Sequence, residues 1–101
     1  MRSRPKVSWK DIPAALRVVC VVAMVNFLSF FVIAVRNGGD AINGKQEGDR
    51  YFVMEHGRYT EVTPQFFAYS RVHAISVWVT HGIAGVGIMF WLINRGKAAP
   101  E

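Results

Sequence analysis

The chain has a single cysteine, and its two apolar stretches contain no acidic residue. Cys20 is the only cysteine among 101 residues, which excludes a disulfide within the chain, and we interpret it as a small apolar side chain. The apolar stretches cover residues 12–35 and 72–93 and contain neither Asp nor Glu. This absence argues against a proton carrier or a small transporter coupled through an intramembrane carboxylate.

Motifs with known chemistry are also missing. The sequence has no Ser/His/Asp set, no nucleotide-binding loop and no zinc-ligand spacing, and it contains no internal repeat or heptad pattern. We therefore expect no catalytic residue, no metal and no cofactor, and we predict that the chain is not an enzyme. The net charge of +5 is compatible with nucleic-acid binding, but no recognition element accompanies it. We expect no nucleic-acid partner.

What the chain does contain is two apolar stretches flanking a polar segment. Residues 18–35 carry no charged side chain, and neither do residues 72–94. A helix of about 20 residues crosses a hydrocarbon core about 30 Å thick. The sequence therefore predicts an all-α membrane protein: a two-span antiparallel helical hairpin in a lipid bilayer, with a structured polar connector.

The distribution of charge predicts the topology of this single domain. Its parts are an N-terminal tail (1–11), a first transmembrane helix (12–36), an external connector (37–63), a long second helix (64–94) and a C-terminal tail (95–101). Both tails are basic, whereas the connector is nearly neutral, so the positive-inside rule places both termini in the cytoplasm. We expect a bacterial inner membrane with a periplasmic connector. A signal peptide is the alternative for the first stretch, but the apolar run exceeds the usual ~7–15 residues.

Capping signals mark the predicted helix ends. Asp11 can cap the first helix, and the pair Gly38-Gly39 can end it, because glycine adopts the left-handed conformation readily. Thr63-Pro64 is typical of a helix start, with the threonine as the N-cap and the proline in the first helical position. Uninterrupted helix from there would extend about two turns beyond the bilayer on the connector side.

The connector contains two short runs rich in aromatic and β-branched residues, 50–54 and 58–62. A three-residue loop ending in Gly57 separates them, which indicates a short β-hairpin. Asn43-Gly44 and residues 47–49 are interpreted as turns. The apolar residues of the two runs could cover the second helix, or they could form a partner surface, for which the candidates are Tyr51, Phe52, Val53 and Tyr59.

Few polar residues interrupt the predicted spans: Asn26, Ser29, Ser76, Thr80 and His81. Helix rise places Asn26 and His81 at a similar depth, about 15 Å below the connector-side interface. We expect a hydrogen bond between Asn26 or Ser29 and Thr80 or His81. An intramembrane histidine can also ligate haem, relay a proton or contact a quinone, but a neutral His81 bonded to Asn26 is the preferred interpretation.

Small residues recur along one side of the second stretch. Ser76, Thr80 and Ala84 are spaced by four, and Gly87 continues the same face, while His81 and Gly85 form an adjacent row. A stripe of small residues lets another helix approach closely. The first span can fill one row, and a second chain would be needed to fill the other.

Two functions remain open from the sequence. The first is an accessory, assembly or stabilising subunit of a larger membrane complex, with other membrane-protein subunits as partners. The second is a homo-oligomeric pore or channel, lined or gated by the glycine-rich second helix. The polar stripe that a pore needs is thin here, which favours the accessory subunit.

Overall fold

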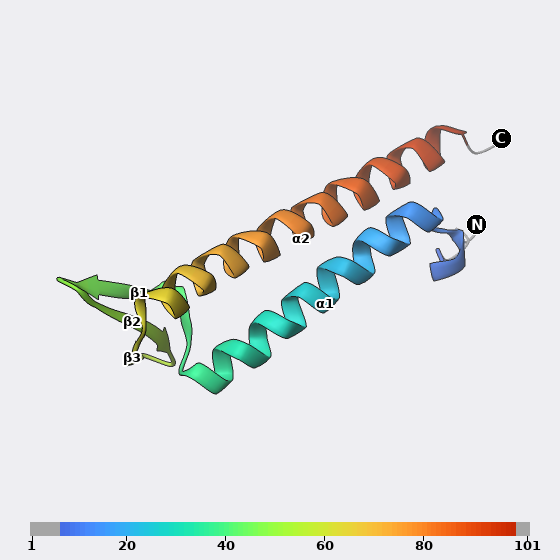
Figure 1. Cartoon of the computed structure of the whole chain (residues 1–101). Helices are drawn as coiled ribbons and strands as arrows, with labels where there is room; N and C mark the ends of the chain where they lie inside the picture. The colour runs from blue at the N-terminus through green and yellow to red at the C-terminus, as the bar shows by residue number, and fades with distance from the viewer. Residues whose placement is uncertain (1–6, 99–101) are drawn as a thin grey trace.

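The computed structural model describes residues 7–98, which form two long helices joined by a small sheet (Figure 1). A short 3₁₀ turn, η1 (Trp9–Asp11), precedes helix α1 (Ala14–Asn37). Strands β1 (Asp40–Glu47), β2 (Arg50–Glu55) and β3 (Arg58–Val62) follow, and helix α2 (Pro64–Ala98) ends the chain. The molecule is 64 Å long. The predicted all-α class is therefore incomplete, because a three-stranded sheet lies between the helices.

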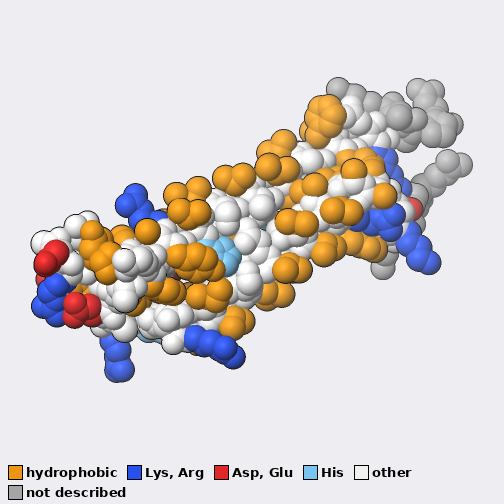
Figure 2. Space-filling view, viewed as in Figure 1, with side chains coloured by type: hydrophobic (Ala, Val, Ile, Leu, Met, Phe, Trp, Pro, Cys, Tyr) orange, Lys and Arg blue, Asp and Glu red, His pale blue; other side chains and the backbone are white. Residues whose placement is uncertain are grey.

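The two helices pack side by side and run in opposite directions (Figure 1). Leu16 in the first turns of α1 faces Gly87 of α2, where a β-carbon would lie 2.7 Å from the leucine Cδ1. Both helices are long and apolar enough to cross a membrane. Most of their large apolar side chains are exposed, and Figure 2 shows these side chains over the length of the helix pair, with charged groups gathered towards its ends.

Glycine and threonine end and begin the helices as the sequence predicts. Gly38 follows α1 with φ 87°, and its N–H donates to the carbonyl of Ala34. The hydroxyl of Thr63 accepts the N–H of Phe66 over 3.1 Å, which caps the start of α2. The prediction for Asp11 is wrong. Its carboxylate accepts the N–H of Ser8 within the 3₁₀ turn, and α1 starts later, at Ala14.

The predicted hairpin is present as β2 and β3, which pair in register from Tyr51–Val62 to Glu55–Arg58. Strand β1 was not predicted, because Asn43-Gly44 is typical of a turn. The pairing of β1 with β2 shifts between Asp40 and Lys45, so residues 41–44 all lie opposite one residue of β2. Gly44 allows this bulge, since a side chain there would collide with the carbonyl of Phe52.

A small core fixes the sheet to the first turns of α2. Val53 is completely buried, together with Ala41 of β1 and Phe67 of α2. The buried hydroxyl of Ser70 accepts the N–H of Ala41 over 2.9 Å, which ties the start of β1 to α2. Residues 1–6 and 99–101, which belong to the predicted tails, lie outside the described residues. The connector is therefore a folded element anchored mainly on α2.

Candidate functional site

A cluster of polar side chains lies between the two helices, centred on Asn26 of α1 and His73 of α2. The Asn26 Nδ2 donates to the Oγ of Ser76 over 3.0 Å and to the Oγ1 of Thr80 over 3.4 Å. Its Oδ1 lies 2.9 Å from the His73 Nε2. The other ring nitrogen of His73, Nδ1, lies 2.7 Å from the hydroxyl of Tyr69. One amide of α1 thus connects to three side chains of α2.

The partners of His73 assign its tautomer. Three oxygens lie near Nε2. The side-chain and backbone carbonyls of Asn26, at 2.9 and 3.3 Å, can only accept a hydrogen bond, and the Ser29 hydroxyl, at 3.3 Å, already donates to the Asn26 backbone carbonyl. A ring with one proton therefore carries it on Nε2, and its Nδ1 accepts the hydroxyl proton of Tyr69. Ser76 in turn donates to the carbonyl of His73 over 2.6 Å. The neutral cluster is internally satisfied, as a polar group in an apolar surrounding requires.

His81 does not take the place that the sequence predicts for it. The expected bond between Asn26 and Thr80 is present, at 3.4 Å. The His81 Nδ1 instead lies 3.1 Å from the carbonyl of Val77 in its own helix, and its ring packs edge-on against Phe27. Helix rise alone gives the depth of a residue but not its direction around the axis. One residue beyond Thr80 turns the side chain by about 100°.

His73, which was not among the residues predicted to bond to Asn26, occupies the central position. The spacing of His73 and the hydroxyl-bearing residues near it in the sequence could have indicated this position. Tyr69, His73, Ser76 and Thr80 are separated by four, three and four residues, so they lie on one face of a helix. Ser29 completes the group from α1, because its hydroxyl donates to the Asn26 carbonyl over 2.9 Å and lies 3.3 Å from the His73 Nε2.

Of the two predicted rows of small residues on α2, the row from Ser76 to Gly87 contacts α1, and the glycine of the adjacent row, Gly85, does not. Ser76 and Thr80 contact Asn26, Ala84 is half-buried, and Gly87 faces Leu16 of α1. A β-carbon added at Gly82 or Gly85 would meet no atom within 4 Å. The packing face of α2 is therefore filled by α1, whereas the adjacent glycines are open.

An apolar groove follows the open side of α2. It has a volume of about 620 Å³ and is lined by Trp78, Val79, Gly82, Ile83, Val86, Gly87 and Phe90. Three of its side chains are among the most exposed large apolar side chains of the described residues, with Trp78 at 75%, Val86 at 69% and Phe90 at 68%. Large side chains around a glycine form a concave surface that suits a second helix or a lipid chain.

The four residues predicted as a partner surface do not share one face of the sheet. Val53 is buried in the core, and Tyr51 packs against Phe67 with ring centroids 5.1 Å apart. Phe52 and Tyr59 point to the opposite face, where the Lys45 ammonium lies 4.2 Å from the Tyr59 ring centroid. Strand residues alternate between faces, so consecutive positions cannot form one surface. Only Phe52 and Tyr59 remain as candidates.

Two ion pairs surround this aromatic pair. Arg50 donates from two nitrogens to the carboxylate of Glu61, over 3.2 and 2.8 Å, and this lowers the pKa of Glu61 below its ordinary value of 4.5. The hydrogen bond from Lys45 lowers the pKa of Glu47 in the same way, and the pKa values of both basic partners are raised. All four groups are solvent-exposed, so these pairs contribute little to stability.

In the part of the chain that the structure describes, His, Cys, Asp and Glu side chains form no group of three that could hold a metal ion. The polar cluster between the helices, the open groove of α2 and the aromatic pair of the sheet are the features that a function can use. No protein-family model, curated protein or solved structure matches the chain.

Proposed function

We propose that the chain spans a lipid bilayer twice and acts as an accessory, assembly or stabilising subunit of a larger membrane complex. The supporting observation is how polar and apolar side chains are divided in the helix pair. Asn26, Ser29, His73, Ser76 and Thr80 bond to one another or to backbone carbonyls between the helices. The outer surface is left apolar, and a surface of this kind needs lipid or protein around it.

The distribution of charge supports a proposal for the location within the cell. The basic termini belong on the cytoplasmic side of a bacterial inner membrane, and the sheet belongs in the periplasm. The first test is extraction of membranes at alkaline pH, which strips peripheral proteins from the bilayer. The chain should stay with the lipid pellet, and release into the supernatant would overturn the membrane assignment.

The open groove of α2 supports the accessory role. It is unfilled in the helix pair, its floor contains Gly82, and its walls are large apolar side chains such as Trp78 and Phe90. A homo-oligomeric pore would instead need polar side chains facing a water path. The polar groups of the helix pair are turned towards each other, which leaves little to line such a path.

The deciding experiment is extraction from the native membrane in a mild detergent, followed by mass determination of the intact assembly. A larger partner at fixed stoichiometry is expected. A symmetric ring of identical chains that conducts ions in a planar bilayer would refute the accessory role and establish the pore.

Two matched substitutions sharpen this experiment. A β-carbon at Gly82 or at Gly96 meets no atom within 4 Å, so Gly82→Leu and Gly96→Leu should leave the isolated chain folded. Gly82→Leu fills the groove and should displace the partner, whereas Gly96→Leu, near the helix end, should not. Retention of the partner by both variants would place the contact elsewhere on the chain.

A further inference from the structure

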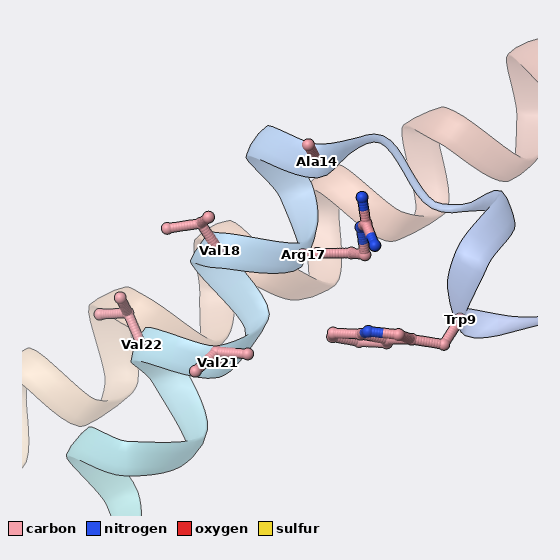
Figure 3. Close-up of a pocket in the computed structure, with 6 residues that line it drawn as sticks. All are labelled: Trp9, Ala14, Arg17, Val18, Val21 and Val22. Atoms are coloured by element: carbon pink, nitrogen blue, oxygen red, sulfur yellow. The ribbon is translucent and has the colours of Figure 1, made fainter.

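A second groove lies at the opposite end of the molecule from the sheet, where the N-terminal segment passes beside α1. It has a volume of about 330 Å³ and is lined by Trp9, Ala14, Arg17, Val18, Val21 and Val22. Figure 3 shows Arg17 extending from α1 towards the segment that carries Trp9, with the indole ring lying below it. The groove thus has one cationic group, one indole ring and an otherwise apolar lining.

The residues of α1 that line the groove form two parallel ridges along the helix. Ala14, Val18 and Val22 are spaced by four and form one ridge, and Arg17 and Val21 begin the neighbouring ridge. A furrow between two such ridges runs away from the guanidinium and towards the middle of the helix pair. It is suited to an extended hydrocarbon chain whose polar end lies at Arg17.

The polar end of the groove has an unsatisfied donor. Among the described residues, the Arg17 Nε is buried and has no hydrogen-bond acceptor; the Arg95 Nη1 of α2 is in the same state but does not line the groove. None of the ion pairs formed by residues 7–98 includes either arginine. Asp11, the acidic residue nearest in sequence to Arg17, has its carboxylate bonded to the N–H of Ser8. Within residues 7–98, no acidic side chain therefore pairs with the positive charge of Arg17, and a buried donor without an acceptor is costly.

We propose that this groove binds one anionic phospholipid, with the phosphodiester at Arg17 and an acyl chain along Val18, Val21 and Val22. The planar guanidinium presents several N–H donors in a geometry that matches phosphate oxygens. Trp9 is placed where tryptophan favours the interface between headgroups and hydrocarbon. The inference rests on the membrane insertion proposed above, but not on the accessory role.

Charge selects an anionic lipid over a zwitterionic one. Lys10, Arg17 and Arg95 are basic residues at this end of the described part of the chain, where Asp11 is the acidic residue and can offset one of them. A phosphatidylcholine headgroup would bring its own cation close to these side chains. A headgroup with a net negative charge, such as phosphatidylglycerol, brings none. The pairing therefore differs from the attraction of a basic tail to a charged surface, because it depends on a defined residue and a defined groove.

The test uses the purified, delipidated chain in a neutral detergent. Phosphatidylglycerol and phosphatidylcholine with the same acyl chains are titrated separately, and native mass spectrometry counts the bound lipids. One phosphatidylglycerol should bind with a Kd at least about tenfold lower than that of phosphatidylcholine, because both lipids offer the phosphodiester but only phosphatidylcholine brings a cation close to the basic side chains. Equal affinities for the two lipids would overturn the proposal.

Arg17→Gln should bring the two affinities together, while circular dichroism shows the helices unchanged. Arg36→Gln is the matched control, because Arg36 is an exposed arginine at the other end of the same helix and should keep the preference. An equal loss in both variants would show non-specific attraction. Displacement of the lipid by inorganic phosphate at the same concentration would show a phosphate site without an acyl subsite, and would also overturn the proposal. None of these outcomes affects the alkaline extraction test.

Discussion

Replacing Asn26 by leucine should loosen the contact between the two helices. The substitution removes three side-chain hydrogen bonds across the interface, to His73, Ser76 and Thr80. Hydrogen bonds between transmembrane helices average about 0.6 kcal/mol each. The expected loss is therefore about 2 kcal/mol, or roughly thirtyfold in the equilibrium between the packed and separated helices.

The loss is limited because the partners retain other bonds. Ser76 and Thr80 still donate to carbonyls of their own helix, over 2.6 and 3.2 Å. The His73 Nε2 keeps the backbone carbonyl of residue 26 within 3.3 Å. The substitution should therefore weaken helix pairing without abolishing it.

The assay is unfolding in mixed micelles with increasing sodium dodecyl sulfate, followed by circular dichroism and by energy transfer between labels on the two helices. Val25→Leu is the control, because Val25 is 59% exposed on the neighbouring face and its replacement should change nothing. A double-mutant cycle combining Asn26→Leu with His73→Leu measures the coupling of the pair. Strictly additive effects, or an unchanged transition for Asn26→Leu alone, would refute the assigned network.

Three further predictions concern the same cluster and the sheet. Tyr69→Phe removes the donor to the His73 Nδ1 and should cost about 1 kcal/mol, and nitrogen NMR of the ring should still show the proton on Nε2, because the Asn26 carbonyls remain its acceptors. Because the pKa of Glu61 is lowered in the folded sheet, the unfolded chain binds more protons than the folded chain as the pH falls below the ordinary value of 4.5. The small contribution of the Arg50–Glu61 pair to stability should therefore be present above pH 4.5, should be lost as the pH falls through the lowered pKa, and should be missing in Glu61→Gln. Val53→Ala should cost about 2 kcal/mol in denaturant unfolding, whereas Phe52→Ala on the open face should cost less than about 1 kcal/mol; a larger cost for the second would contradict the assigned faces.

The sequence predicts the elements whose signals are local. Long apolar runs identify both helices, and Thr63 and Gly38 set two of their ends through bonds to nearby backbone. The β2–β3 hairpin follows from two short runs around Gly57. Each of these features depends on residues close together in the chain, so composition and spacing suffice to place them.

Strand β1 and the role of His73 depend on contacts between distant segments. The sequence of β1 is polar, and it becomes a strand because its backbone pairs with β2 and its start is bonded to Ser70. His73 becomes central because of the way α2 is turned against Asn26, which helix rise alone does not give. The groove between Trp9 and Arg17 likewise depends on the path of the segment carrying Trp9 beside α1, which no sequence pattern indicates.

The anchoring of the sheet on α2 makes the two ends of the helix pair mechanically unequal. At the sheet end, α1 continues directly into β1, and the bond from Ala41 to Ser70 holds that strand against α2. At the far end, the facing residues Leu16 and Gly87 touch without any chain connection. Because the helix ends at the sheet are held together and the opposite ends are not, a change in the angle between α1 and α2 displaces the opposite ends most. A molecule bound beside Arg17 lies at these ends, where the displacement between the helices is largest.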